Sequence, residues 1–431
     1  MQGFLNAVNG VVWGAPMLIF FIFTGLHFSF KSRFYQIKNS PKSFKIFLNS
    51  IFDKTEGKGI SQFSTFCSVL GACIGTGNIV GVATAIYSGG AGTVFWMVVS
   101  AFLSMMTAYA ENYLGASYSK RYYFVKNASG ALLYIENGLN MKGLAKIYAF
   151  LCLMSVFGMG NMTQSNSLAD AMNVTFNVSP VITSVLIAIL SFFIIKGGIK
   201  RISTLQTILV PVATLFYLVI SAAVLIKFRS NITPCIHLIF TEAFSLKALG
   251  GFGMYKAMRY GIARGVFSNE AGLGSSTFLH AQSHNLNGNI QGISAMAEVF
   301  IDTIFMCTIT ALVILVSTPY EDTSLYGAGL SSLAYNSIGS IGKIGVGILT
   351  AIFSFLSLIS CSFYGESAFN YLFKGKYTKA YVVIYVILVF VGGSNSPEAV
   401  WSIADIFNGL MAIPNLFAIN CLSKEVQYEQ R

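Results

Sequence analysis

The sequence contains 431 residues, of which 55% are hydrophobic and 10% are charged. Globular proteins carry about 25% charged residues, so this composition excludes a soluble domain and predicts an all-α polytopic membrane protein. The net charge of +11 does not favour nucleic acid binding, because the basic residues lie in the gaps between apolar runs and form no basic module.

The first predicted spanning helix covers residues 11–30, about the twenty residues needed to cross a hydrocarbon core of roughly 30 Å. A connector over residues 31–59 follows, and its apolar residues predict a short amphipathic helix on the membrane surface. These apolar residues are Phe44, Ile46, Phe47, Leu48, Ile51 and Phe52, and the basic residues of the connector are Lys31, Arg33, Lys38, Lys42, Lys45, Lys54 and Lys58. The positive-inside rule places the connector in the cytoplasm and the N-terminus outside.

Ten further spanning helices are predicted from the remaining apolar runs. We expect them at about residues 61–87, 93–118, 144–176, 181–195, 202–226, 252–278, 292–317, 344–373, 381–391 and 401–422. Most basic residues between them fall in alternate connectors, with the exceptions Lys227, Arg229, Lys247, Lys256 and Lys343. The total of about eleven helices places the C-terminus in the cytoplasm.

Two of these helices are interrupted by glycines. The first interruption reads LGACIGTGNIVG over residues 70–81, and the second reads GIARGVFSNEAGLGSS from residue 261. Each interior glycine weakens a helix by roughly 0.5 to 1 kcal/mol relative to alanine, so we expect a break at residues 75–78. A break at membrane depth must face protein, a ligand or water, and a pair of such breaks indicates the substrate site of a secondary transporter. Close helix packing is the alternative explanation.

The helices after the first divide into two sets of five, and each set begins with its broken helix. Because five is odd, the two sets enter the membrane from opposite sides, which predicts inverted repeats and a leucine-transporter-like fold. We expect the N-terminal helix and connector at residues 1–59, the repeats at residues 60–230 and 231–423, and a cytoplasmic tail at residues 424–431.

Asn78 and Gln164 are neutral amides within apolar surroundings, and an amide both donates and accepts hydrogen bonds. Free N–H groups after Gly77 favour a carboxylate, whereas free carbonyls at the end of the inner half-helix favour an ammonium group or Na⁺. A small amino acid carries both groups. These residues therefore predict an amino acid site at the first break.

Other polar residues of the apolar runs are less specific. Asp302 and Glu298 lie four residues apart. They either form a proton relay or pair with lysine or arginine, and we expect the pairing. Glu111, Glu366 and Asp405 are expected to be structural ion-pairing or capping residues.

No nucleophile-elbow, phosphate-loop or HExxH motif is present, so we expect no enzyme activity and no cofactor. His280 and His284 also lie four residues apart, and without a third ligand nearby a solvated helix end is a better explanation than a metal site.

Five segments together resemble the alanine or glycine:cation symporter family over residues 63–420. They read GTGNIVGVATAIYSGGAGTVFWM, FGMGNMTQSNSLADAM, ARGVFSNEAGLGSS, VFIDTIFMCTITALVIL and IADIFNGLMAIPNL. The resemblance implies an inner-membrane symporter that imports alanine or glycine, in some members glutamine, together with Na⁺. It implies substrate contacts at Thr76, Gly77, Asn78, Gln164, Phe267, Ser268 and Asn269. It also implies Na⁺ ligands at the carbonyls of Gly71 and Ile74 and at hydroxyls of the ninth helix around Ser357.

The ninth helix departs from the family pattern. Relatives resemble FSTILGWYYYGE, whereas this chain reads FLSLISCSFYGE over residues 355–366, so Leu356 replaces one hydroxyl. Ser354, Ser357 and Ser360 remain the candidate ligands. The alternative is that these serines only bond back to their own helix. A second departure, SGALLYIE in place of GGPMYYIE at residues 129–136, is expected to affect packing and not transport.

The alternatives to Na⁺ symport are a proton-coupled amino acid porter, in which Asp302 or Glu270 titrates, and a channel or receptor. The absence of a sizeable soluble segment disfavours a receptor. We expect the lipid bilayer, a small neutral amino acid and Na⁺ as partners, with no nucleic acid and no obligate protein partner.

Overall fold

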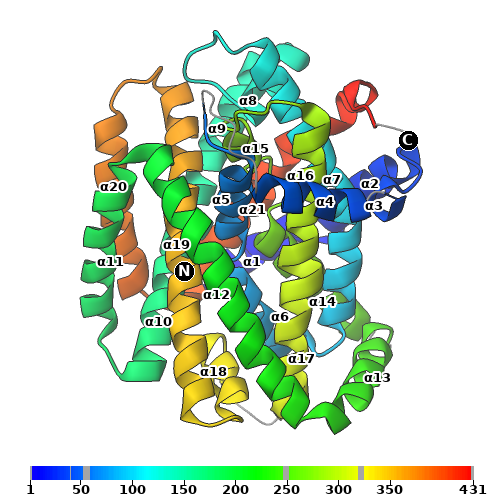
Figure 1. The fold of residues 1–431 in the computed structure, drawn as a ribbon, viewed down its shortest axis with the longest axis vertical. Helices are drawn as coiled ribbons and strands as arrows, with labels where there is room; N and C mark the ends of the chain where they lie inside the picture. The colour runs from blue at the N-terminus through cyan, green and yellow to red at the C-terminus, as the bar shows by residue number, and fades with distance from the viewer. Residues whose placement is uncertain (1, 39, 52–58, 246–251, 319–324, 429–431) are drawn as a thin grey trace.

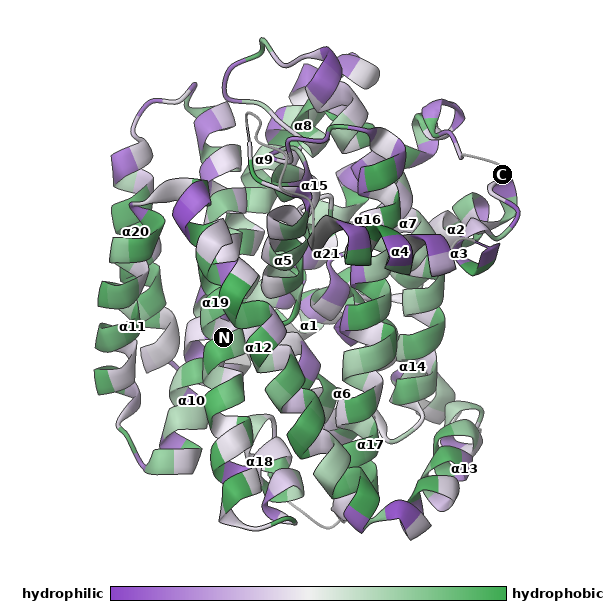
Figure 2. Ribbon diagram, viewed as in Figure 1, coloured by the Kyte–Doolittle hydropathy of each residue, from purple (hydrophilic) through white to green (hydrophobic). Residues whose placement is uncertain are grey.

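The computed structural model describes residues 2–38, 40–51, 59–245, 252–318 and 325–428, and this part of the chain is built of helices and their connections. Its single isolated β-bridge joins Ile60 to Ser283. Long helices run side by side along the vertical axis of Figure 1. Figure 2 shows that hydrophobic residues cover the middle of these helices and that hydrophilic residues gather at both ends. This distribution is typical of a protein that spans a bilayer.

The N-terminal segment consists of α1 (Gln2–Val12) and α2 (Ala15–Lys31), followed by the short helix α3 (Tyr35–Lys38). The amphipathic helix predicted in the connector is present as α4 (Ser40–Ile51), which contacts α5 and α16. Phe52, Lys54 and Lys58, which the sequence analysis also assigned to this connector, lie outside the described residues.

The other predicted helices are found with shifted ends. They are α7 (Thr93–Arg121), the run α9 (Lys142–Ser155), η3 (Val156–Thr163) and α10 (Gln164–Phe176), α11 (Pro180–Ile195), α12 (Gly198–Lys227), the run α16 (Gly288–Val299), η5 (Phe300–Cys307) and α17 (Thr308–Ser317), α19 (Ser340–Leu372), α20 (Thr378–Ser394) and α21 (Pro397–Cys421). Within the described ranges, seven helices are long and apolar enough to span a membrane, or eight with one bent pair, and α11 and α20 are shorter apolar helices. The total of eleven stays a prediction.

The bent pair is the first predicted broken helix. It consists of α5 (Gln62–Cys73), then η1 (Gly77–Gly81) and α6 (Val82–Gly89), with a bend of 43°. Ser61 caps the start of α5, since its Oγ accepts a hydrogen bond from the Ser64 amide at 3.1 Å. The break covers residues 74–76, so the prediction that residues 77 and 78 are also unwound is wrong. Both belong to the wide π-helical turn η1.

The second broken helix consists of α14 (Phe252–Asn269), a non-helical segment over residues 270–276, and the short helix α15 (Thr277–His280). The two broken helices meet, because α14 contacts η1, and both of these contact η5. The core around them combines buried apolar residues with many buried polar side chains.

Short helices outside the predicted ranges include α8 (Ala131–Leu133), α13 (Ile232–Ala243) and α18 (Ala328–Asn336). Each is far shorter than a membrane span, so a search for long apolar runs does not find it. In Figure 1, α13 and α18 lie at the lower end of the molecule, and α8 lies at the upper end.

Candidate functional site

The first break exposes backbone groups that a continuous helix would pair. The amide of Gly75 donates to the carbonyl of Cys73 at 2.8 Å instead of reaching back to Gly71. The amide of Thr76 donates to Oε1 of Gln164 at 3.2 Å, and Nε2 of Gln164 donates to the Met159 carbonyl at 3.2 Å. Gln164 therefore connects the break to the run of α9, η3 and α10.

Gly75 needs to be glycine because neighbouring side chains crowd the break. A Cβ atom on Gly75 would lie 2.8 Å from Cβ of Ser357 and 2.9 Å from Oε1 of Gln164. Any larger residue would push α10 or α19 away from the break. The glycines of this segment thus permit both the bend and the close approach of its neighbours.

Asn78 and Ser268 meet at the carboxylate of Asp302, which is fully buried on η5. Nδ2 of Asn78 donates to Oδ1 of Asp302 at 2.8 Å and to its backbone carbonyl at 2.9 Å. Oγ of Ser268 donates to Oδ2 of Asp302 at 2.7 Å, and the Thr303 hydroxyl donates to the same oxygen at 2.7 Å. The prediction that Asp302 pairs with lysine or arginine is wrong, because its partners among the described residues are neutral donors.

The remaining predicted substrate residues lie close by on α14. Nδ2 of Asn269 donates to the Thr303 hydroxyl at 3.1 Å, and Oδ1 accepts from the Ala271 amide at 3.0 Å. The ring of Phe267 stacks on Trp401 with a centroid separation of 4.9 Å. The structure therefore brings the two predicted groups, from the first and second breaks, into one buried cluster.

Several buried polar atoms near this cluster have no hydrogen-bond partner among the described residues. They are Oγ1 of Thr76, Oδ1 of Asn78 and Oγ1 of Thr163. An unpaired buried polar atom costs about 1 to 3 kcal/mol, so such atoms are normally satisfied. Thr76 and Asn78 belong to the first break region and Thr163 precedes Gln164, so these atoms fit a site beside the first break that receives a polar ligand.

The predicted Na⁺ ligands differ in their surroundings. Oγ of Ser357 donates to the carbonyl of Ala72 at 2.6 Å, which places this serine between α19 and the end of α5. Oγ of Ser354 donates to the Thr350 carbonyl of its own helix at 2.6 Å. Gly71 precedes Ala72 on the inner half-helix, and Ile74 is the first residue of the break after Cys73. Ser357 thus lies with the predicted carbonyl ligands, whereas Ser354 behaves as the back-bonding alternative describes.

Gln206 on α12 is a residue that the sequence analysis missed. Its side chain is fully buried, and Nε2 donates to the carbonyl of Leu356 at 2.8 Å and to Oγ of Ser360 at 2.6 Å. A backbone carbonyl only accepts, so the nitrogen must face Leu356 and the oxygen must face the other way. Within the part of the chain that the structure describes, Oε1 has no hydrogen-bond partner, and it lies over Gly71, where an added Cβ would sit 1.9 Å from it. The available signal was that Gln206 is the single side-chain amide of α12.

Glu111 stabilises the second break. Its carboxylate accepts from the amides of Gly272 at 3.2 Å and Gly274 at 3.1 Å and from Nδ2 of Asn415 at 2.9 Å. Gly272 and Gly274 have φ of +88° and +74°, values that other residues rarely adopt. The predicted capping function of Glu111 is present, and its target is the second broken helix and not the end of its own helix.

A polar cavity of about 620 Å³ lies on one side of the cluster and is lined by Arg264, Trp401 and Asp405. Arg264 forms a bidentate ion pair with Asp405, at 2.9 and 2.6 Å, and its guanidinium lies 4.9 Å from the Trp401 ring centroid. The expected structural ion pairing of Asp405 is confirmed. Trp401 also stacks on Phe267, so Arg264, Trp401 and Asp405 together separate the cavity from the buried cluster.

A second network closes the region where α5 begins. Gln62 accepts from Ser283 at 2.9 Å and from Gln291 at 2.7 Å, and His280 contacts Glu298 at 3.0 Å. His280 is fully buried, so the expected solvated helix end is wrong. Glu298 also does not take the lysine or arginine partner expected for it, because this histidine occupies the position.

Comparison with known proteins identifies the transporter class. The whole chain, residues 1–431, matches the sodium:alanine symporter family. The chain belongs to that family. It is therefore a membrane transporter and not an enzyme. The sodium/alanine symporter AgcS of Methanococcus maripaludis is 38% identical over 434 residues, which cover 99% of this chain and 96% of the relative.

Two further comparisons place this sodium:alanine symporter family member among its relatives. The probable sodium/glutamine symporter GlnT of Bacillus subtilis is 30% identical over 432 residues, which cover 99% of this chain and 89% of GlnT. The crystal structure of MhsT in complex with L-phenylalanine aligns with a TM-score of 0.61 at 15% identity, over 85% of this chain and 89% of MhsT. The fold is thus of the leucine-transporter type.

Proposed function

We propose that this protein imports a small neutral amino acid, alanine or glycine, together with Na⁺ by alternating access, with glutamine as a further candidate substrate. The observation that carries the proposal is the meeting of two helix breaks at one buried cluster that holds unpartnered polar atoms. The sodium/alanine and sodium/glutamine relatives support these substrates. We place the protein in the cell inner membrane, with the N-terminus outside and the C-terminus in the cytoplasm.

The substrate carboxylate is proposed to bind where η1 begins, near the hydroxyl of Thr76 and the amide of Gly77, because the N-terminal end of a helix attracts an anion. The ammonium group is proposed to face Asp302 and Oδ1 of Asn78. A carboxylate whose hydrogen-bond partners among the described residues are all neutral is suited to balance that positive charge.

The Na⁺ ion is proposed to lie at the end of α5, held by the carbonyls of Gly71 and Ile74 and by the hydroxyl of Ser357. We add Oε1 of Gln206 as a further oxygen ligand. Oε1 lies against Gly71, and Nε2 of the same side chain donates to the carbonyl of Leu356, the position at which the family hydroxyl is missing. Gln206 therefore compensates for Leu356. Ser354 contributes less, since its hydroxyl is used within its own helix.

Proton coupling is the second candidate, and the position of Asp302 is the observation that favours it. This carboxylate contacts residues from both broken helices, so its protonation would alter the same cluster. Uptake at fixed pH with and without Na⁺ separates the two candidates.

Uptake of labelled alanine, glycine and glutamine into proteoliposomes with an imposed Na⁺ gradient tests the proposal. Concentrative and saturable uptake of alanine or glycine that requires inward-directed Na⁺ supports it. Uptake driven equally by a proton gradient without Na⁺ favours the second candidate, and passive non-saturable flux overturns both.

A further inference from the structure

A small cavity of about 10 Å³ lies between the second break, η3, α19 and α21. Glu270 and Ser275 line it from the non-helical segment of the second break, and Cys361 and Tyr364 line it from α19. A cavity needs about 10 to 15 Å³ to hold one water molecule, so this one has room for a single small ion. The amino acid substrate does not fit into it.

Glu270 brings a buried carboxylate to this cavity. The residue is 2% exposed, and its Oε2 accepts a hydrogen bond from Oγ of Ser275 at 2.6 Å. Its Oε1 has a weaker contact, with Sγ of Cys361 at 3.8 Å. None of the ion pairs between described residues includes Glu270. Because a buried charge without a counter-charge costs several kcal/mol, this carboxylate requires a cation or a proton.

Tyr364 contributes a second oxygen that needs a partner. It is 1% exposed, and its hydroxyl makes no hydrogen bond with any part of the chain that the structure describes. A buried tyrosine hydroxyl usually has a partner. A proton on Glu270 would neutralise the carboxylate but would not fill the cavity. Hard cations prefer oxygen ligands, and a carboxylate with two hydroxyls supplies them.

We propose that this cavity is a second Na⁺ site, in which Glu270 supplies the negative charge and Ser275 and Tyr364 supply hydroxyl oxygens. This inference deepens the proposed Na⁺ coupling and rests on it, because it adds a second ion to the one at the end of α5. Cys361 connects the two sites, since its Sγ lies 3.8 Å from Oε1 of Glu270 and 3.9 Å from Oγ of Ser357. Both ions would thus contact the same stretch of α19.

Na⁺ binding to the purified full-length protein tests the proposal. Radioactive Na⁺ is titrated in detergent, with choline added so that the ionic strength stays constant. We expect the wild type to bind two Na⁺ ions per chain and E270Q to bind one. Y364F should retain both sites, with one of them about tenfold weaker. It should unfold at the wild-type temperature in choline alone, because the hydroxyl that it removes has no partner among the described residues.

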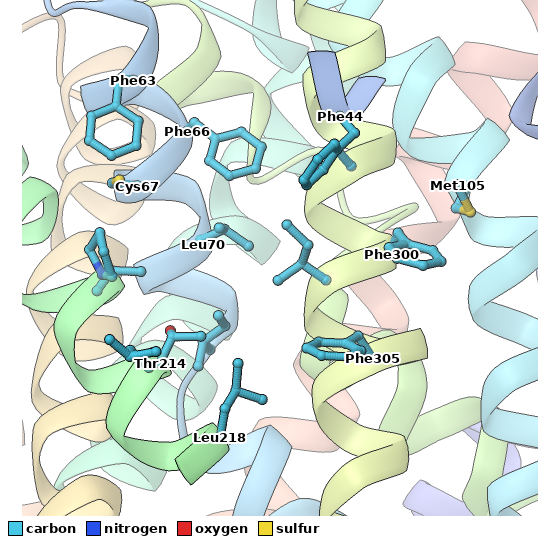
Figure 3. Close-up of a pocket in the computed structure, with 16 residues that line it drawn as sticks. Phe44, Phe63, Phe66, Cys67, Leu70, Met105, Thr214, Leu218, Phe300 and Phe305 are labelled. Carbon is cyan, nitrogen blue, oxygen red and sulfur yellow. The ribbon is translucent and has the colours of Figure 1, made fainter. Parts of the chain in front are cut away.

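The apolar groove along α5 supplies a matched control for Y364F. Figure 3 shows Thr214 together with Phe66, Leu70 and other apolar side chains that line this groove of about 620 Å³. The Thr214 hydroxyl is also buried and has no hydrogen-bond partner among the described residues. None of the described residues that line the groove is acidic, so T214V should leave both Na⁺ affinities unchanged.

Glu366 supplies the control for E270Q. It is half-buried on α19, two residues after Tyr364, but it does not line the cavity. E366Q should therefore bind two Na⁺ ions per chain.

The binding measurement separates failure of this inference from failure of the proposed function. One Na⁺ ion in the wild type that E270Q and Y364F leave unchanged would overturn the second site and leave Na⁺ symport standing. No Na⁺ binding at all would overturn both. An equal loss of thermal stability in Y364F with and without Na⁺ would assign the cavity to a water molecule, and a loss of Na⁺ binding in T214V or E366Q as large as in Y364F would assign the effect to packing. Either result would overturn the second site.

Discussion

Gln164 holds the first break in place, and its removal should affect substrate binding. We expect Gln164→Ala to weaken alanine binding by about one to two orders of magnitude. The reason is that the Thr76 amide loses its acceptor and a hydrogen bond to a charged ligand group is worth roughly 1.5 to 3 kcal/mol. Isothermal titration of the purified protein measures the change.

Asn166 provides the control for this prediction. It lies on the same helix and is also buried, but its Nδ2 donates to the carbonyls of Gly392 and Asn395. Asn166→Ala should reduce thermal stability while it leaves affinity within about threefold. Unchanged affinity in Gln164→Ala would place the substrate elsewhere.

Ser357 and Ser354 form a matched pair on α19. We expect Ser357→Ala to raise the Na⁺ concentration for half-maximal uptake about tenfold, because an oxygen beside the Ala72 carbonyl is lost. Ser354→Ala should leave that concentration nearly unchanged, since its hydroxyl bonds to Thr350 of the same helix. Uptake at a series of Na⁺ concentrations and saturating alanine measures both. Equal effects in the two variants would contradict the assignment.

Gln206 offers a test by rescue. We expect Gln206→Met to raise the half-maximal Na⁺ concentration about tenfold because it removes Oε1 at similar volume. Adding Leu356→Thr should restore much of the affinity, since a threonine returns a hydroxyl to the position where the family pattern has one. Na⁺-dependent uptake by the single and double variants measures this.

Thr207→Val is the control for Gln206. Thr207 also joins α12 to α5, through a hydroxyl contact of 2.7 Å with Ser64, but it does not face the break. A loss of Na⁺ affinity in Thr207→Val equal to that in Gln206→Met would assign the effect to helix packing and not to an ion ligand.

The residues of the candidate site could be predicted from sequence only where their type is unusual for a membrane helix. Glycines and amides such as Asn78 and Gln164 stand out against an apolar background. The partners of Asp302, Glu298 and His280 could not be predicted, because a buried carboxylate takes whatever donor the packing brings to it. That choice depends on contacts between segments far apart in the chain.

At the scale of the elements, the second break depends on one carboxylate. We expect Glu111→Ala to lower the unfolding temperature by several degrees, since it leaves the buried amides of Gly272 and Gly274 without an acceptor at about 1 to 3 kcal/mol each. Lys142→Ala removes an exposed ion pair with Glu136 and should change little. Thermal unfolding in detergent, followed by tryptophan fluorescence, compares the two. Equal stability of both variants would contradict the capping function.

The positions of the helices could be predicted from the length of the apolar runs and the placement of glycines, whereas the ends of the helices could not. The helical run from Lys142 to Phe176 is longer than a membrane span needs, and its apolar pattern predicted this length. The first break covers residues 74–76 and not the predicted 75–78, because Gly77 and Asn78 widen into a π-helical turn instead of unwinding. That choice is determined by the neighbours of η1 on α14 and η5, which no local pattern encodes.

At the scale of the whole molecule, the orientation in the membrane follows from the distribution of lysine and arginine and from the number of spans. Eight spans are present when the bent pair is included. Adding α11, α20 and the second broken helix is compatible with an odd total. An odd total would place the two termini on opposite sides, and the basic residues within 31–51 are the reason that we propose an N-terminus outside.

Single cysteines at Asn6 and Gln430, in a background without the native thiols, test this orientation. Gln430 lies outside the described residues, and the test needs only its place in the sequence. A membrane-impermeant maleimide added to intact cells should label the cysteine at residue 6 at once and the cysteine at residue 430 only after permeabilisation. Labelling of both from the same side would require an even number of spans, and it would remove the inverted relation between the two repeats on which the transport proposal depends.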